Sequence, residues 1–341
     1  MAKRDYYFDN GKFLLIFFVV FGHFIRSLID ESIFIRALYN TIYTFHMPAF
    51  ILISGYFASP ELNKKKLVKL IKRLLIPYFI FQTIYIFFYY FLINDALDFD
   101  YFYPEWSLWF LLSLFFWHLL LSVFARFKPA LGLLLALFCG IGIGYLDIPG
   151  TFLSISRTFV FFPFFLLGYY MKREHFRMLR SKVLIFPAIN ILLITFFLFY
   201  AFPDFDFRWL FGSKVYAEME TVLPTPALQR IVVYLLSVNM TFSFFVLVPE
   251  KRYRFTFVGK YTLYVYLLHG FFIQVFRTIA WPEWLTQGYL VATFSLFSLV
   301  LIFFLSSEYI RLFAQPLIEL RWTKLKRLWK QLTRRYRELH T

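Results

Sequence analysis

The stretch Asp9-Asn-Gly-Lys12-Phe-Leu-Leu-Ile-Phe-Phe-Val-Val-Phe-Gly-His23 contains the first half of the first long apolar segment of the chain. A helix rises about 1.5 Å per residue, so His23 should lie roughly 16 Å beyond Lys12, near the middle of a hydrocarbon layer about 30 Å thick. The spacing is also close to three whole helical turns, so both side chains should project from nearly the same face. The stretch therefore predicts a helix that links a cation near the surface to a titratable group halfway along it.

The composition around this segment predicts an all-α integral membrane protein. Of the 341 residues, 60% are hydrophobic and 51 are phenylalanine, and the mean hydropathy is +0.64. A soluble core of this length uses less apolar surface than this. Apolar windows predict about ten transmembrane helices, near 12–29, 36–57, 74–93, 107–125, 130–146, 157–171, 183–202, 227–248, 257–279 and 287–313.

Charge divides the connecting loops into two alternating kinds. Lysine and arginine gather at the N-terminus, in the tail after Ala314 and in the loops that hold Lys64-Lys65-Lys66, Arg126 and Lys128, Lys172-Arg173, and Lys251-Arg252. The other loops carry mainly aspartate and glutamate. By the positive-inside rule, this alternation predicts a multi-pass protein of the bacterial plasma membrane with both termini in the cytoplasm.

The net charge of +16 follows mostly from this topology. Because the basic residues are spread over several short loops, they do not form the continuous patch of a nucleic-acid-binding protein. Anionic lipid of the inner leaflet is the expected partner instead. The single cysteine, Cys139, excludes an internal disulfide and a cysteine-based metal site, and no metal is expected.

Two regions are expected, a transmembrane domain over residues 1–313 and a cytoplasmic tail over residues 314–341. All connecting loops are short, so any chemistry must lie within the helical bundle. In the tail, apolar residues recur at steps of four and three between basic ones, at Ile318, Trp322, Leu325, Trp329, Leu332, Tyr336 and Leu339. This pattern predicts a basic amphipathic helix that lies on the anionic inner leaflet or, alternatively, docks onto a partner helix.

Small residues form a stripe in the segment near 130–146. Gly132, Ala136, Gly140 and Gly144 recur every four residues and therefore share one helix face. Such a smooth face permits close approach by another helix, and we interpret the stripe as a packing surface.

Four histidines fall inside the expected membrane helices, namely His23, His46, His118 and His269. Ionisable groups cost free energy in a bilayer, so they usually face the bundle interior and mark a functional path. We interpret His118, which no motif surrounds, as structural. His46 stands beside Pro48, which should disturb its helix, and His269 follows Tyr266 by three residues. Catalytic and structural roles are both open for His46 and His269.

His23 stands apart because cations flank it on the same helix, at Lys12 and Arg26. Desolvation and neighbouring positive charge both disfavour the imidazolium form. A neutral imidazole can accept a proton, as a general base must. We therefore expect a catalytic or proton-relay role for His23.

Five blocks of sequence, in this order, resemble the acyltransferase-3 family of integral-membrane acyltransferases, closest to its fucose 4-O-acetylase-like branch. They are Asp9-(x)2-Lys12-(x)10-His23, Phe45-His-Met-Pro-Ala-Phe50 with Ser54-Gly-Tyr-Phe57, Trp106-Ser-Leu-Trp-Phe-Leu111, Phe161-Phe-Pro-Phe-Phe-Leu-Leu-Gly168, and Tyr264-Val-Tyr-Leu-Leu-His269. The resemblance runs from about residue 4 to residue 313 and leaves only the basic tail outside.

The resemblance implies an enzyme that takes an acyl group, usually acetyl, from acyl-CoA in the cytoplasm. It implies a sugar hydroxyl of a surface glycan, or of its lipid-linked precursor, as the acceptor. In that family the basic residue and the histidine of the first helix are functional, which maps onto Lys12 and His23. Arginine is commoner at the first position, and lysine offers a point charge where arginine offers a planar fork.

This reading assigns expected roles to particular residues. The phosphates of acetyl-CoA should remain on the basic side, with Asp9, Lys12, Lys72 and Arg73 as the donor-binding set. The acceptor should approach from the acidic side, where Arg26, Trp106, Trp109, Arg157 and Trp209 offer stacking faces and hydrogen-bond donors. His23 acts either as a general base on the sugar hydroxyl or as an acyl carrier, and His46 and His269 are the further catalytic candidates.

Two readings from other functional classes stay open at this stage. A proton-coupled transporter or flippase of a lipid-linked glycan would use the histidines as a relay. The absence of an internal sequence repeat argues against it. A non-catalytic scaffold in a glycan-assembly complex is the third reading. The sequence does not select the acceptor glycan, nor acetyl over succinyl.

Overall fold

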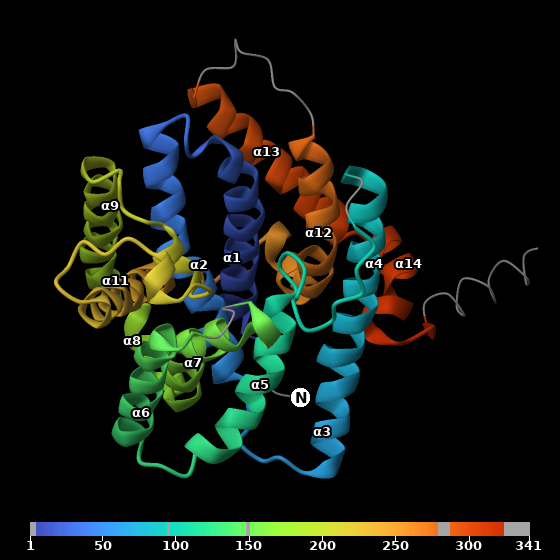
Figure 1. The fold of residues 1–341 in the computed structure, drawn as a ribbon, viewed down its shortest axis with the longest axis horizontal. Coiled ribbons are helices and arrows are strands. Elements are labelled where there is room, and N and C mark those ends of the chain that lie inside the picture. Colours follow the sequence, from blue (N-terminus) through green and yellow to red (C-terminus); the bar gives the residue numbers. More distant parts are fainter. Residues whose placement is uncertain (1–4, 94–95, 148–150, 279–286, 324–341) are drawn as a thin grey trace, which may run out of the picture.

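The computed structural model describes residues 5–93, 96–147, 151–278 and 287–323. These residues form α-helices joined by turns and loops, without a strand among them (Figure 1). The α-helices are α1 (Tyr6–Ile25), α2 (Ile33–Tyr56), α3 (Lys64–Leu70), α4 (Ile76–Ile93), α5 (Trp109–Phe124), α6 (Pro129–Gly142), α7 (Ile155–Tyr170), α8 (Arg173–Leu179), α9 (Ile185–Ala201), α10 (Arg208–Phe211), α11 (Pro226–Leu247), α12 (Thr262–Arg277), α13 (Gln287–Leu305) and α14 (Glu308–Glu319). Short helical turns complete the described chain, at η1 (Arg26–Leu28), η2 (Ile71–Leu75), η3 (Ile143–Tyr145), η4 (Phe152–Ser154), η5 (Lys182–Leu184), η6 (Tyr216–Glu218) and η7 (Arg254–Lys260).

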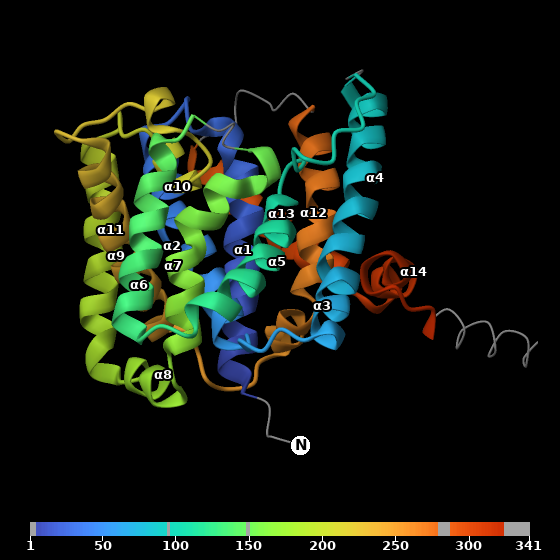
Figure 2. The same ribbon diagram turned by 60° about the horizontal axis from the view of Figure 1, so that its bottom comes forward.

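The long helices run roughly side by side between two ends of the molecule. Figure 2 shows α3 and α8 at one end and α10 at the other. The basic residues Lys64-Lys65-Lys66 and Lys172-Arg173 lie in or beside the first two helices, whereas Asp204 and Asp206 precede α10. The basic and the acidic loops thus lie at opposite ends, as the sequence pattern indicates.

Five helical segments within the described residues are long and apolar enough to cross a membrane, and the count is six if a bent pair is one span. They are Tyr6–Leu28, Lys64–Ile93, Phe152–Tyr170, Lys182–Ala201 and Pro226–Leu247. The other expected ranges also contain helices, but these helices are shorter or more polar than the five segments named above. The helix α2 runs unbroken through Pro48, and it buries Asn40, Thr44 and His46 inside the bundle.

The last expected span is two helices. The helix α13 ends at Leu305, α14 begins at Glu308, and their axes differ by 67°. Ser307 caps α14 by accepting a hydrogen bond from the N–H of Ile310 at 3.4 Å. The expected domain boundary at residue 313 therefore lies inside a helix, and α14 ends at Glu319 with Leu320 in a left-handed conformation. The rest of the amphipathic tail, residues 324–341, lies outside the described residues.

The helix α1 lies in the core, against α2, α12, α13 and η7. The side chain of Asn10 is fully buried, and its Nδ2 donates hydrogen bonds to the carbonyl oxygens of Pro249 and Lys251 at 2.7 and 2.8 Å. Its Oδ1 accepts a hydrogen bond from the hydroxyl of Thr256 at 2.7 Å. The hydroxyl of Tyr7 adds a bond to the carbonyl oxygen of Phe245 at 2.7 Å. These bonds fix the position and rotation of α1.

The helices α2 and α7 cross at their closest points through two glycines. A Cβ atom at Gly55 would collide with the backbone carbonyl of Phe165, and one at Gly168 would collide with that of Leu52. Both glycines are therefore needed for the backbones to approach. Because α2 and α7 each carry residues that face the site described below, this crossing also sets the separation of those residues.

The stripe of small residues on α6 packs against the bundle, as the sequence predicts. All four of its members are buried, and α6 lies along α7. A Cβ atom at Gly140 would lie 2.9 Å from the carbonyl oxygen of Phe159 on α7. Gly142 has open space around it instead, because it faces away from this contact.

The glycine contacts make a prediction about stability. The free energy of unfolding of the Gly168→Ala variant should be lower than that of the wild type by about 3 kcal/mol or more, because the added methyl group forces α7 away from α2. The Gly142→Ala variant has room for the methyl group, so it should be as stable as the wild type or up to about 1 kcal/mol more stable. Thermal unfolding of both variants in detergent measures the difference, and equal unfolding temperatures would contradict the crossing.

Candidate functional site

One face of α1 lines a cavity inside the bundle. The cavity has a volume of about 450 Å³, and α1 with the first residue of η1 contributes Lys12, Ile16, Val19, His23 and Arg26 to its wall. These positions recur at steps of four and three, as the residues of one helix face do. The prediction that Lys12 and His23 share a face is confirmed.

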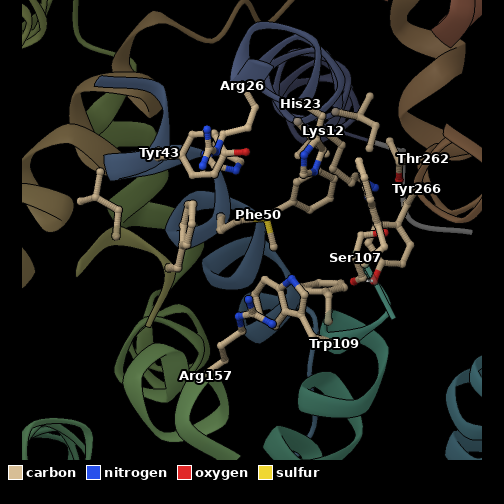
Figure 3. Close-up of a pocket in the computed structure, with 18 of the residues that line it drawn as sticks. Lys12, His23, Arg26, Tyr43, Phe50, Ser107, Trp109, Arg157, Thr262 and Tyr266 are labelled. Carbon is tan, nitrogen blue, oxygen red and sulfur yellow. Dashed lines mark hydrogen bonds between the residues drawn. The ribbon is translucent and has the colours of Figure 1, made fainter. Parts of the chain in front are cut away.

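Other helices close the cavity around this face. The wall includes Tyr39, Tyr43, His46, Met47, Phe50 and Ser54 of α2, Trp106, Ser107, Trp109 and Phe110 at the start of α5, Arg157 of α7, Leu210 and Phe211 of α10, and Thr262, Leu263, Tyr266 and Arg277 of α12. Figure 3 shows His23 facing a space that Arg157 and Trp109 border from the other side. The cavity thus gathers residues from five long helices.

His23 lies nearer to the end of its helix than the sequence indicates. Asp5 starts α1 early, because its carboxylate accepts a hydrogen bond from the N–H of Tyr7 at 3.1 Å. The helix therefore begins at Tyr6, well before Lys12, and His23 falls in its last turn. The position is about 26 Å along the axis from Tyr6. The expected place halfway along the helix is wrong, whereas the spacing from Lys12 is right.

His269 and Trp106 lie beside the imidazole of His23, with ring centroids at 5.4 and 4.9 Å from it. His269 is fully buried, and its Nδ1 lies 2.7 and 3.0 Å from the carbonyl oxygens of Tyr266 and Val265. A carbonyl oxygen only accepts, so Nδ1 carries the proton and Nε2 presents a lone pair. That Nε2 atom is buried and has no hydrogen-bond partner in the described part of the chain. It is therefore available as an acceptor.

His46 lines the same cavity in the same tautomer. Its Nδ1 donates to the carbonyl oxygen of Ile42 at 2.9 Å, one turn earlier in α2, which leaves Nε2 as the acceptor. The ring of Tyr43 packs edge-on against it, with centroids 4.4 Å apart. The fourth histidine, His118, is not part of the cavity wall and packs against Phe165. His23 and His46 thus line the cavity, and His269, which is not among the wall residues, packs against His23.

Trp106 reaches the cavity because a buried glutamine holds the loop before α5. Gln82 of α4 donates to the carbonyl oxygens of Asp100 and Tyr103, both at 2.9 Å, and accepts from the N–H of Glu105 at 2.9 Å. Trp106 has a φ of 47°, a left-handed backbone conformation that is unfavourable for a bulky residue. Its indole N–H is buried and lacks a hydrogen-bond partner among the described residues. A donor of this kind can bind an oxygen atom of a substrate.

Three arginines line the cavity toward the end where α10 lies. Each guanidinium stacks on an aromatic ring, Arg26 on Phe207, Arg157 on Trp109 and Arg277 on Trp106, with Cζ to centroid distances of 4.7, 5.0 and 4.8 Å. Arg277 also donates a hydrogen bond to the carbonyl oxygen of His23 at 3.1 Å. The sequence analysis did not select Arg277. The signal that selected Arg157, an arginine at the outer end of an expected span, also applies to Arg277.

The expected donor-binding residues are only partly brought together. Lys12 lines the opposite end of the cavity, and its Nζ lies 3.4 Å from Oδ1 of the buried Asp9. Lys72 and Arg73 are exposed residues of the π-helical turn η2 and do not belong to the cavity wall. Across the described ranges, no group of three His, Cys, Asp or Glu residues could hold a metal ion.

Trp209, expected on the acceptor side, is fully buried and outside the cavity wall. Its Nε1 donates to the carbonyl oxygen of Glu220 at 2.7 Å, and its ring stacks on that of Tyr216. Asp206 lies in the same loop region. Burial raises the pKa of Asp206, but hydrogen bonds from Arg208 outweigh this effect and hold the pKa below its ordinary value. These residues organise the loop structure around α10.

Comparison with known proteins gives one match over most of the chain. A family model described as an acyltransferase domain matches residues 5–308. Nodulation protein NolL of Mesorhizobium japonicum is 38% identical over 66 residues, which cover 18% of this chain and 18% of that protein. Nodulation protein NolL of Sinorhizobium fredii is 42% identical over 60 residues, which cover 17% of this chain and 16% of that protein. Both alignments thus span less than a fifth of the relative's length, and no solved structure matches the chain.

The cavity predicts which positions water-soluble reagents can reach. In a Cys139→Ser background, the Ser54→Cys variant should react with a water-soluble maleimide, because Ser54 lines the cavity. The Ser298→Cys variant is an isosteric control that should not react, because Ser298 is fully buried outside the cavity wall. Mass spectrometry of the intact chain measures both reactions. Equal labelling of the two variants would contradict a hydrated cavity.

Proposed function

The chain belongs to the acyltransferase-3 family, an enzyme family that transfers acyl groups, and we propose that it moves acetyl from cytoplasmic acetyl-CoA to a sugar hydroxyl. The acceptor is a cell-surface glycan or its lipid-linked precursor, in line with the resemblance to the fucose 4-O-acetylase-like branch. One observation carries the proposal. The cavity follows α1 from Lys12 past His23 to Arg26, about 21 Å at 1.5 Å per residue. Donor and acceptor can therefore enter from opposite ends.

We propose that ten helical ranges cross the plasma membrane and that both termini face the cytoplasm. The separation of basic and acidic loops at the two ends supports this orientation (Figure 2). In this orientation Lys12 lies toward the cytoplasm, and Arg26 lies toward the outside. Because Ala314 and Ile318 of α14 pack in the bundle, the proposed contact of the basic tail with anionic lipids of the inner leaflet falls to the residues after Glu319.

The donor is proposed to bind at the end of the cavity where Lys12 lies. The ion pair with Asp9 restrains the ammonium group, which supplies a point charge for a phosphate of CoA. Lys72 and Arg73, which are exposed outside the cavity, add positive potential for the remaining phosphates. The thioester then has to travel along the cavity to reach His23.

Two routes of transfer fit this arrangement. In the first, His23 takes the proton of the acceptor hydroxyl while the hydroxyl oxygen attacks the thioester carbon. The new C–O bond forms, the C–S bond breaks, and the leaving CoA thiolate takes the proton back from the imidazolium. In the second, a nitrogen of His23 attacks the thioester carbon, the C–S bond breaks and CoA leaves as the thiolate. The acceptor hydroxyl then attacks the acyl-imidazole, the C–N bond breaks, and the hydroxyl proton passes to the thiolate. Both routes yield the same ester and free CoA.

His269 is proposed as the positioning residue for His23. If its Nε2 lone pair accepts an N–H of His23, the other nitrogen of His23 is left unprotonated and oriented. The centroid separation of 5.4 Å is one from which two facing ring nitrogens come within hydrogen-bond reach. His46, which has the same tautomer, is the second candidate for this role.

The first test removes the imidazole of His23. In proteoliposomes, the His23→Ala variant should transfer acetyl about 10²- to 10⁴-fold more slowly, the share that a general base contributes. The His118→Ala variant should keep wild-type transfer, because His118 lies outside the cavity wall. Radiolabelled acetyl retained on the wild-type chain but not on the His23→Ala chain would select the covalent route. Full transfer by His23→Ala would refute both routes.

The second test concerns the lone pair of His269. The His269→Leu variant removes the acceptor and should lower kcat at least about tenfold with little change in either KM. The His269→Gln variant returns an amide oxygen near the position of Nε2, so it should recover part of kcat and show a shifted pH profile. A loss of folded protein in both variants, or equal kcat values with unchanged pH profiles, would count against a positioning role.

A further inference from the structure

We infer that the outer end of the cavity is an anion site, and that the acceptor carries a carboxylate or phosphate close to the hydroxyl that is acylated. The site consists of Arg26, Arg157 and Arg277, which line the cavity together. The inference rests on the proposed function, because it specifies the chemical class of the acceptor. It assigns Arg277 a binding role and gives Arg26 and Arg157 a common ligand.

The wall of the cavity has an unbalanced charge. It includes three arginines and Lys12, and although Asp9 pairs with Lys12 from beside the wall, none of the wall residues is an aspartate or a glutamate. Arg26 and Arg277 repel each other electrostatically. Positive groups that share a partly desolvated space cost free energy unless an anion accompanies them. The wall is thus complementary to a negatively charged ligand.

Three other cations near this end are paired with carboxylates, while the buried Arg230 stacks on Trp209 and donates to its carbonyl oxygen. Arg36 lies 2.7 Å from Asp30, Arg208 lies 2.7 Å from Asp206, and Lys214 lies 2.6 Å from Glu218. The three arginines of the cavity make no such ion pair with any residue that the structure describes. The chain therefore supplies a carboxylate to three outer cations and none to the cavity arginines, which keep their charge for a ligand.

Stacking holds these arginines by their faces and leaves hydrogen-bond donors for a ligand, and the one donor already used is that of Arg277 to the carbonyl oxygen of His23. A guanidinium that lies on an aromatic face keeps its N–H edge free, and that edge matches the two oxygens of a carboxylate or phosphate. Ring faces beneath the guanidinium groups also restrict their rotamers. The arrangement is pre-organised for binding rather than for internal pairing.

The position of the site separates its ligand from the phosphates of the donor. Arg26 follows Lys12 by about 21 Å along α1 and follows His23 by less than one turn. Arg277 donates a hydrogen bond to the carbonyl oxygen of His23 itself. An anion bound by these arginines therefore lies next to the reacting histidine, where the acceptor hydroxyl has to be.

Such an anion can come from two parts of an acceptor. It is either the carboxylate of an acidic sugar or the diphosphate that joins a sugar to its lipid carrier. Both bind arginine through paired oxygens, so the same three side chains serve either source. The experiment uses a probe for each.

Three probes distinguish these possibilities with the full chain in detergent. They are a disaccharide that contains glucuronic acid, the same disaccharide with its carboxyl group reduced to an alcohol, and the reduced disaccharide on a short prenyl diphosphate. Binding is measured as the concentration that half-maximally stabilises the chain against heat. We expect at least one charged probe to bind about tenfold or more tightly than the neutral one, and the better charged probe identifies the source.

Substitution of the arginines tests the assignment. The Arg26→Gln, Arg157→Gln and Arg277→Gln variants should each weaken binding of the preferred charged probe about tenfold to hundredfold, with little effect on the neutral probe. The corresponding lysine variants should keep part of the preference because they keep the charge. The Lys214→Gln variant removes an exposed, paired cation at the same end and should bind all probes as the wild type does.

The donor reaction separates failure of this inference from failure of the proposed function. Hydrolysis of acetyl-CoA by the wild type without an acceptor, lost in His23→Ala, supports the transfer function whatever the probes do. Equal binding of the three probes, or binding of none, would overturn the anion site. A preference for a charged probe without any consumption of acetyl-CoA would support the anion site and contradict the proposed function.

Discussion

The buried amide of Asn10 is the interaction on which the arrangement of the site depends. Its three hydrogen bonds join α1 to the loop after α11 and to η7, and the Asn10 side chain is fully buried. An unpaired polar group in such surroundings costs several kcal/mol, so α1 is held to one rotation and one height. Lys12 follows Asn10 by two residues. The hydrogen bonds of Asn10 therefore set the direction in which the helix face from Lys12 to Arg26 points.

Buried polar groups in this bundle differ in whether they find a hydrogen-bond partner. Trp117 donates to the carbonyl oxygen of Thr158, and Gln82 donates to two carbonyl oxygens in the loop before α5. Beside His23, Nε2 of His269 and the indole N–H of Trp106 lack partners within the described residues, and so do groups outside the cavity wall, such as the amide of Asn40. Since burial without a partner is costly, the unpaired groups beside His23 are the ones that a substrate in the cavity can satisfy.

Several features of the fold and the site could be read from residue spacing. The shared face of Lys12 and His23 and the packing stripe from Gly132 to Gly144 both follow from the helical period, and both are confirmed. The prediction that His23 lies halfway along its helix is wrong, because the spacing between Lys12 and His23 gives the distance between two residues and not the distance from the start of the helix. That start depends on a single cap at Asp5, a weaker signal than the long apolar run.

The amino-acid sequence by itself determined the helical class, the alternation of charge between the loops and the residues that face one way on each helix, because these depend on local composition and period. Only the tertiary structure decided which faces meet. His46 comes from α2, whereas His269 and Arg277 come from α12, far along the chain, and the packing of both helices against α1 brings them to the cavity and to His23. The same packing leaves Trp209 outside the cavity wall, although it was expected on the acceptor side, and it also leaves out His118, which was interpreted as structural. Contacts between distant segments depend on side-chain fit across helices, which no local pattern records.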